Sequence, residues 1–212
     1  MRKKSDEKRQ YIIDTAYQLF RASGFEKTSM AEISAKVGGS KATLYNYYSS
    51  KEELFVDCML DLAEHYLEDI FSSMHDPKMD LQTALHGFGE KALRLICSPE
   101  MLDARRLMFA EAERSGIGKM FYEKISSWQE EITGFLARSM DDGKLRQCTP
   151  LLASLQFRAL LEAEVFEPCI LSVRELPLNE ETIKNAVDHA VDTFLRAYAP
   201  TDISSGGCLP LQ

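Results

Sequence analysis

Residues 28–54 read TSMAEISAKVGGSKATLYNYYSSKEEL, and this stretch decides the expected fold. Ser29 and Glu32 have the spacing of a capping box, in which a hydroxyl and a carboxylate satisfy reciprocal backbone donors at a helix start. A glycine pair then interrupts the chain, and Ser40 is placed to cap a further short helix. Two short helices joined by a tight glycine-containing turn predict a helix-turn-helix.

The side chains of this stretch divide into an inward and an outward set. Ile33, Val37 and Leu44 have the spacing to lock the two short helices together. The outward set consists of Lys41, Ala42, Thr43, Tyr45, Asn46 and Tyr47. A helix fits the major groove of DNA, where lysine donates to guanine, an alanine methyl touches a thymine methyl, and hydroxyls donate to phosphate. Backbone N–H groups at the helix start capped by Ser40 are further phosphate donors. A second interpretation stays open, in which 41–48 is a short aromatic-rich helix packed on a core.

The charge distribution favours a nucleic-acid-facing N-terminal end. The chain has a net charge of -8, which by itself argues against binding to nucleic acid. Residues 1–51, however, hold ten basic and five acidic side chains, whereas the remainder holds fifteen basic and twenty-eight acidic ones. Because the acidic remainder repels phosphate, this asymmetry also favours one orientation of approach to DNA.

Helical periodicity continues along the chain, and no segment alternates with a period of two. The sequence therefore predicts an all-α protein of about nine helices. They are expected over about 6–23, 29–37, 40–48, 50–73, 80–97, 98–115, 119–140, 149–168 and 180–198. Gly24 suits the position just after the first helix, and the tail 200–212 is polar with no helical pattern.

Composition and motifs exclude several classes of protein. The 212 residues are 45% hydrophobic and 27% charged, which is typical of a soluble globular protein. There is no apolar run near the roughly 18 residues of a membrane span and no apolar segment behind the charged N-terminus, so we expect a cytoplasmic protein without a membrane partner. The five cysteines are widely spaced and the four histidines dispersed, which argues against a disulfide framework or a metal site. Nucleophile-elbow, Walker A, dinucleotide and H-E-x-x-H motifs are all missing from the sequence, so we expect neither an enzyme nor a cofactor.

The stretch that begins near Arg9 and ends near Phe55 resembles the DNA-binding domain of the TetR/AcrR family of regulators. The closest pieces are 28–34, 38–45 and 47–55, and the length and helical content of the chain agree. The resemblance implies that phosphates are held by Thr28, Thr43, Tyr45, Tyr47 and Lys51. It implies that bases are faced by Lys41 and Ala42, with Asn46 as a weaker candidate. The sequence departs from the family at Gly39, where an apolar residue is usual, and at Tyr48, where phenylalanine is common.

The resemblance also implies a division of the chain. Residues 1–51 would form the DNA-binding domain, 52–199 a helical domain for ligand sensing and dimerisation, and 200–212 a flexible tail. The last two long helices, 149–168 and 180–198, would form the interface of a homodimer. A broad apolar stripe on the last helix agrees, because it is wider than one neighbour would cover. The alternative is that this stripe belongs to the core of a single chain.

The middle helices are expected to enclose a pocket for a small molecule. Large apolar or aromatic side chains suit an apolar or aromatic ligand, and charged side chains on apolar helices could orient a polar group of it. The candidate residues are Arg105, Met108, Phe109, Trp128, Phe157, Leu161 and Glu164. The alternative is that the apolar ones are ordinary core and that the charged ones form structural ion pairs.

These expectations combine into a ligand-responsive DNA-binding regulator. We expect a repressor that a small, largely apolar or aromatic effector releases from a palindromic double-stranded DNA operator. Activation stays open, because the sign of regulation depends on where the operator lies. The competing hypothesis is an all-helical protein-interaction module that has lost operator binding, and salt-dependent, sequence-selective DNA binding would separate the two.

Overall fold

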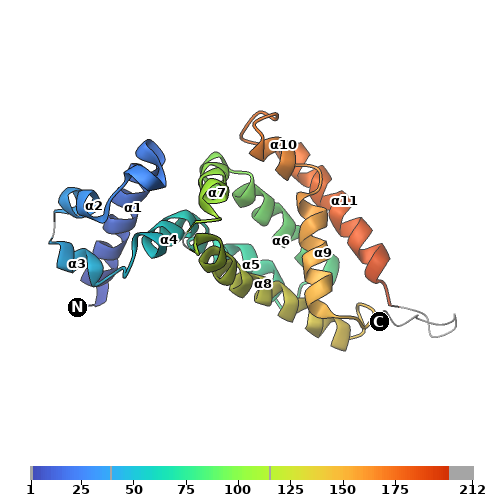
Figure 1. Ribbon diagram of the computed structural model, residues 1–212. Helices are drawn as coiled ribbons and strands as arrows, with labels where there is room; N and C mark the ends of the chain where they lie inside the picture. Colours follow the sequence, from blue (N-terminus) through green and yellow to red (C-terminus); the bar gives the residue numbers. More distant parts are fainter. Residues whose placement is uncertain (1, 39, 115, 201–212) are drawn as a thin grey trace. The chain divides into compact units, whose positions relative to one another are not determined.

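The described residues of the chain form helices and no strands (Figure 1). The computed structural model describes residues 2–38, 40–114 and 116–200, and the expected tail lies outside them. The helices are α1 (Arg2–Lys27), α2 (Met30–Val37), α3 (Lys41–Tyr45), α4 (Lys51–Glu64), α5 (Leu67–His75), α6 (Leu81–Ile96), α7 (Pro99–Glu111), α8 (Ile117–Asp141), α9 (Pro150–Glu162), α10 (Phe166–Ile170) and α11 (Glu180–Tyr198). The predicted all-α class is confirmed. No helix in this described part is both long and apolar enough to cross a membrane.

The chain divides into two compact units. The first unit comprises Met1–Glu68, Leu95–Ser126 and Cys169–Pro177, and the second comprises Asp69–Arg94, Ser127–Pro168 and Leu178–Gln212. The first unit therefore contains α1 to α4 together with α7, and the second contains α6, α9 and α11 nearly entire.

The core of the first unit forms around α1, which packs against α2, α4 and α7. The apolar positions that the periodicity placed on one face of α1 are all buried, namely Ile12, Ile13, Ala16, Leu19 and Phe20. The ring of Phe20 lies 5.0 Å from that of Phe55, edge to face, and 5.9 Å from that of Phe25. Each such ring pair stabilises the fold by about 1 kcal/mol beyond the contribution of its buried apolar area. This cluster therefore fixes the end of α1 against α4.

α1 is bent near its end at Gly24. The backbone of Gly24 has φ 79° and ψ 167°, a conformation that is inexpensive only without a Cβ. The helical pattern ended at Ser23 in the sequence, and helical hydrogen bonding resumes for one short turn after the bend, to Lys27. Gly24 therefore interrupts the helix as predicted.

Side-chain caps set the starts of several helices. The Oγ of Ser29 accepts the N–H of Glu32 at 3.2 Å, and the Oγ of Ser50 accepts the N–H of Glu53 at 3.0 Å. The carboxylate of Glu53 accepts the N–H of Ser49 at 2.8 Å, one residue earlier than a capping box would have it. Each of these bonds satisfies a backbone donor that has no partner inside the helix, which stabilises the start by about 1 kcal/mol.

An aromatic row forms much of the core of the second unit. Successive ring centroids are 4.5 to 6.1 Å apart along Phe71, Phe88, Phe157, Phe194 and Tyr198. A Cβ on Gly89 would come within 2.9 Å of Leu161 and Val187, so α6 approaches α9 and α11 closely at this glycine.

The apolar stripe of α11 faces the interior of the second unit. Its buried members are Ile183, Val187, Ala190, Val191, Phe194 and Tyr198, each at most 3% exposed. The stripe belongs to the core of a single chain, so the argument from its width to a dimer interface was wrong. The reason is that α9 and α6 both cover α11, so that the stripe has more than one neighbour.

Two helices that the sequence predicts as continuous are divided. The segment 50–73 forms α4 and α5, and the segment 149–168 forms α9 and the start of α10, which gives eleven described helices rather than about nine. At the first break, the Nδ1 of His65 lies 2.7 Å from the carbonyl oxygen of Asp61. The Nδ1 of His86 makes the same kind of contact with the carbonyl of Gln82, at 2.9 Å, inside the continuous α6, so this contact accompanies the break without explaining it.

Candidate nucleic-acid interface

The turn between α2 and α3 begins as the sequence indicates. Gly38 adopts φ 70° and ψ 39°, and its N–H donates to the carbonyl of Ser34, which closes the end of α2. The left-handed conformation explains the glycine at this position. The second glycine of the pair, Gly39, lies outside the described residues. The side chains predicted to lock the two helices together are buried, with Ile33, Val37 and Leu44 at 0%, 7% and 2% exposure.

Four of the predicted base-reading and phosphate-holding residues lie together on the outside of α3 and its C-cap. Lys41, Ala42, Tyr45 and Asn46 are exposed, and Tyr45 keeps 51% of its surface in solvent. Thr43 and Tyr47 are half-buried at the edge of this surface. We call the surface formed by these six residues the α3 surface. It presents an ammonium, a methyl group, an amide and aromatic hydroxyls, the groups that read base edges and hold phosphates.

Ser40 has a structural function as the cap of α3. Its Oγ accepts the N–H of Thr43 at 3.2 Å and lies 3.0 Å from the Oγ1 of Thr43. Tyr48 is 2% exposed, and burial and the nearby carboxylate of Asp57 raise the pKa of its phenol. Tyr48 is therefore a core residue, as the open interpretation of this stretch allowed, while Tyr45 is not.

Thr28 and Lys51 bind other parts of the first unit. Thr28 is 1% exposed, and its hydroxyl donates to the carbonyls of Gly24 at 2.8 Å and Leu19 at 3.3 Å. The Nζ of Lys51 donates to the carbonyls of Phe25 and Thr28, at 2.9 and 3.1 Å. The same ammonium lies 4.0 Å from the centroid of the Phe25 ring, a cation–π distance. Lys51 therefore joins the start of α4 to the end of α1, and Thr28 holds the segment after α1 against that helix.

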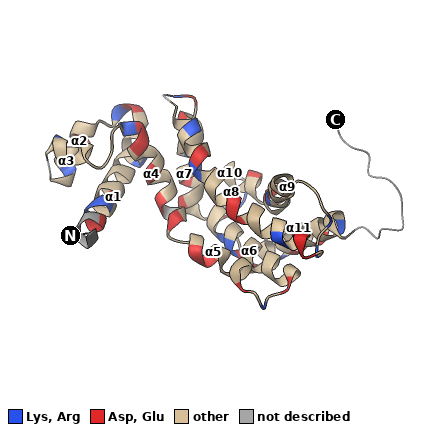
Figure 2. Ribbon diagram, turned by 90° about the horizontal axis from the view of Figure 1, so that it is seen from below, with Lys and Arg blue, Asp and Glu red and all other residues tan. Residues whose placement is uncertain are grey.

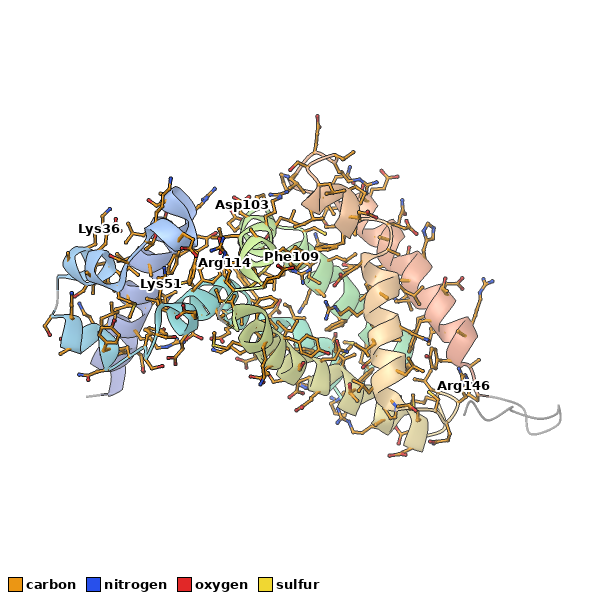
Figure 3. All side chains as sticks on the ribbon, viewed as in Figure 1. Lys36, Lys51, Asp103, Phe109, Arg114 and Arg146 are labelled. Carbon is orange, nitrogen blue, oxygen red and sulfur yellow. The ribbon has the colours of Figure 1, made fainter. Side chains whose placement is uncertain are left out.

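The basic side chains of the N-terminal end are divided between internal contacts and solvent. Lys8 donates to the carbonyl of Val37, Arg9 pairs with Asp57, and Arg21 pairs with Asp103. Lys27, Lys36 and Lys41 are exposed, and none of the three forms an ion pair within the described residues. Figure 2 shows the basic positions of α2 and α3 in blue, and Figure 3 labels Lys36 on α2 and Lys51 at the start of α4. The cations that α2 and α3 offer to phosphate are therefore Lys36 and Lys41.

A buried carboxylate on α4 holds cations from two other helices. Asp57, whose side chain is 9% exposed, accepts from Arg9 of α1 at 2.7 Å and from Lys124 of α8. Burial acts to raise the pKa of Asp57, but the hydrogen bonds and charges of Lys124 and Arg9 outweigh it and the pKa is lowered. Sequence analysis missed this cluster, because residues 9, 57 and 124 share no local pattern.

The residues expected to contact an effector are distributed over both units. In the first unit, Met108 is buried, Arg105 is half-buried and Phe109, labelled in Figure 3, is 58% exposed. In the second unit, Phe157 and Leu161 are buried in the core and Trp128 is half-buried. Glu164 is exposed, with its Oε1 2.9 Å from the Nδ1 of His189.

A cavity of about 380 Å³ lies in the first unit between α1, α4 and α7. None of the seven effector candidates is among the residues that line it. Its apolar lining includes Ile13 of α1, Met59 of α4 and Ala104 of α7. Sequence reasoning missed the cavity, since its walls come from helices far apart in the chain.

Comparisons with known proteins agree with this architecture over nearly the whole chain. Residues 12–58 match the bacterial regulatory proteins of the tetR family, and residues 83–200 match the C-terminal domain of AefR-like transcriptional repressors. A relative of full length is the uncharacterized HTH-type transcriptional regulator YhgD of Bacillus subtilis. It is 22% identical over 189 residues, which are 87% of this chain and 94% of that protein.

Two solved structures are also similar. The flavonoid-responsive regulator FrrA is 28% identical with a TM-score of 0.77, over 93% of this chain and 100% of that one. A TetR family transcriptional regulator from Pseudomonas syringae pv. tomato is 27% identical with a TM-score of 0.70, over 92% of this chain and 98% of that one. The second of the two family matches covers more than half of the chain by itself. With the helix-turn-helix of α2 and α3 in place, the chain belongs to the TetR family of bacterial transcriptional regulators.

Proposed function

We propose that this protein is a repressor that binds a palindromic DNA operator as a homodimer and leaves it when a small effector binds. Members of the family bind DNA operators and small-molecule effectors and act as dimers. The observation that carries the proposal is the α3 surface. It exposes Lys41, Ala42, Tyr45 and Asn46 together on a helix whose opposite side is anchored by Leu44.

Within this surface we assign two kinds of contact. Lys41 and Ala42 face base edges, with Asn46 beside them, while Tyr45 and Tyr47 donate to phosphates. Thr43 and the capped helix start at Ser40 lie at the edge of the contact. Thr28 and Lys51 act indirectly, because their polar groups bind backbone carbonyls and so fix the position of α2 relative to α1 and α4. Residues 1–51 are proposed as the DNA-reading part, 52–199 as the sensing and dimerising part, and 200–212 as a tail.

The dimer is proposed to form through the last two long helices, with α9 supplying the apolar contact. Leu151, Leu152 and Leu155 are 50%, 48% and 43% exposed, and their spacing places them on one side of α9. Leucines that remain exposed together on a helix are suited to a partner subunit. A dimer places two α3 surfaces on successive major grooves, about 34 to 36 Å apart, which explains why the operator is expected to be an inverted repeat.

The effector is proposed to be small and largely apolar or aromatic. The large side chains that support this class are Met108, Phe109, Trp128, Phe157 and Leu161, and the charged candidates that could orient a polar group are Arg105 and Glu164. The similar regulator FrrA is described as flavonoid-responsive, and a flavonoid is an aromatic molecule. Such an effector acts only through its differential affinity for the DNA-binding and the released state.

Selection of bound duplexes from a random DNA pool by the purified full chain tests this function. We expect an enriched inverted repeat whose affinity falls steeply with salt, because Lys and Arg contacts to phosphate release counterions. Lys41→Ala should weaken binding to the selected sequence by about tenfold or more, since one good base contact gives roughly 1–3 kcal/mol of discrimination. Glu123→Gln, an exposed substitution on α8, is the control.

A pool from which no sequence is enriched, with Lys41→Ala binding DNA no differently, would overturn the proposal. That result would favour a protein-interaction module that keeps the fold.

A further inference from the structure

We propose that the cavity between α1, α4 and α7 binds an organic cation, a protonated or quaternary amine with an apolar body. The binding itself stands without the proposed function, and only its effect on DNA affinity rests on that function. The cavity has a volume of about 380 Å³, within the roughly 300–1,000 Å³ of small-molecule sites. It is partly open to solvent, because the lining residues Asp14, His65, Tyr66 and Glu100 are exposed. Its residues all belong to the first unit.

The apolar part of the wall suits the body of such a ligand. Ile13, Cys58, Met59 and Ala104 line the cavity, and each is at most 5% exposed. These side chains come from α1, α4 and α7, so they are held by the packing of all three helices. Burial of an apolar group against them removes it from water at about 25 cal/mol per Å².

Each of the three helices also brings one carboxylate to the cavity. They are Asp14 of α1, Asp61 of α4 and Glu100 of α7. No Lys or Arg is among the lining residues, but His65 is, and its Nδ1 lies 3.9 Å from the Oδ2 of Asp61. The amide Nε2 of Gln10 donates to Asp61 at 2.7 Å and to Asp14 at 3.1 Å, which joins two of them without neutralising either.

Two other carboxylates of the first unit have cationic partners. Asp57 pairs with Arg9 and Lys124, and Asp103 pairs with Arg21 and Arg106. Asp14 and Glu100 form no ion pair within the described residues. The cavity is therefore a place where a positive charge from outside the chain gains the partner that an ammonium group needs on leaving water.

Two lining groups have pKa values that are raised mainly by burial. Burial raises the pKa of the Cys58 thiol, and the charges of Asp57, Asp61 and Asp14 raise it further. Burial also raises the pKa of Tyr17, where Asp103 and Glu100 add to the increase against the opposing charge of Arg21. Both groups therefore stay neutral near neutral pH, so the negative charge at the cavity comes from its carboxylates.

The cavity suits an organic cation better than a metal ion. Two aromatic side chains line it, Tyr17 and the 50% exposed Tyr66, and aromatic rings bind ammonium groups through their faces. No three His, Cys, Asp or Glu side chains of the described residues gather closely enough to hold a metal ion. A divalent cation would need several oxygen ligands at once, whereas an ammonium group needs one carboxylate and an apolar surround.

Calorimetric titration of the full chain with benzyltrimethylammonium, benzyl alcohol and benzoate tests the proposal. These probes share an aromatic ring and differ in charge. We expect the cation to bind at least tenfold more tightly than the other two. Glu100→Gln and Asp14→Asn, both at exposed positions, should each weaken binding of the cation about fivefold at low salt, the size of one partly screened ion pair.

Two further variants locate the binding site. Ala104→Met fills the cavity and should abolish binding of the cation, with the melting temperature measured to show that the variant folds. Glu130→Gln removes an exposed carboxylate of the second unit, distant in sequence from every lining residue, and should leave binding unchanged. Equal binding of the three probes, or loss of binding in Glu130→Gln but not in Glu100→Gln, would overturn the proposal.

A DNA-binding measurement separates this site from the proposed function. If the selected operator exists, benzyltrimethylammonium should lower operator affinity in the native chain and not in Ala104→Met. Tight binding of the cation with unchanged operator affinity would refute the coupling alone. Tight binding in a protein that selects no operator would refute the proposed function and leave the cavity site established.

Discussion

Lysine side chains ten positions apart in the first unit have different surroundings. The ammonium of Lys51 donates to two backbone carbonyls and lies over the Phe25 ring, whereas Lys41 extends from α3 into solvent. A lysine that satisfies carbonyls at a helix end contributes to folding, and an exposed lysine on a recognition helix is available to DNA. The place of a lysine in the fold, rather than its residue type, therefore decides whether it stabilises the fold or is available to DNA.

We expect Lys51→Met to lower the thermal stability of the protein more than Lys41→Met does. Methionine keeps an apolar chain beside Phe25 but removes both hydrogen bonds, which contribute roughly 1 kcal/mol each. The melting temperature should fall by several degrees, as about 2 kcal/mol implies for a chain of this size. Thermal unfolding of Lys51→Met and Lys41→Met measures this contrast. An equal fall of the melting temperature in Lys41→Met would contradict the exposed position of Lys41 on α3.

Asp57 is expected to make stability depend on acid pH. Its folded pKa lies below the unfolded value of about 3.9, so its stabilisation is fully present above that value. The stabilisation is lost as the pH falls through the lower, folded pKa. Asp57→Asn should therefore cost about 2 kcal/mol near neutral pH, between the values for buried and exposed pairs, because Arg9 and Lys124 are partly exposed.

Urea unfolding of the native chain and Asp57→Asn at a series of pH values measures this dependence. The difference between the two free energies of unfolding should be constant above about pH 5 and should shrink below about pH 4. Asp142→Asn is the control, because Asp142 pairs only with Lys144 at an exposed position. A difference that grew on acidification would contradict the assignment.

At the scale of the helices, the sequence predicts the starts and ends that local chemistry sets. Ser29 and Ser50 begin helices through their own hydroxyls, and Gly24 and Gly38 interrupt or end them through positive φ values. The break after α4 could not be predicted in this way. The apolar periodicity runs through it, and residues 64–67 contain no glycine or proline that would mark it.

Two glycine substitutions should therefore act in opposite directions. Gly24 has a positive φ and open space around its missing Cβ, so Gly24→Ala should destabilise the chain by about 1 kcal/mol through backbone strain alone. Gly134 lies inside α8, where a Cβ would meet only the end of Arg138 at 3.5 Å. Gly134→Ala should stabilise it by up to about 1 kcal/mol through helix propensity. Thermal unfolding of both variants measures whether each substitution raises or lowers stability. A stabilising Gly24→Ala would contradict the positive φ of Gly24 at the bend of α1.

At the scale of the whole molecule, one binding surface could be predicted from the sequence and another could not. The α3 surface consists of neighbours along one short helix, so spacing was enough to propose it. The cavity of the first unit brings Asp14, Asp61 and Glu100 together from three helices, and only their packing makes them neighbours. For the same reason the α11 stripe was misread, since its width showed burial but not which chain buried it.

The homodimer is the property of the whole molecule that a single substitution can test. Leu152→Glu places a charge among the exposed leucines of α9, so it should convert the dimer into a monomer. Loss of the partner also removes one of the two α3 surfaces that contact the operator, so operator affinity should fall at least tenfold. Leu171→Glu is the matched control, because Leu171 is 65% exposed but belongs to the first unit. Sedimentation equilibrium measures the mass of each variant, and a dimer that persisted in both Leu152→Glu and Leu155→Glu would place the interface away from α9.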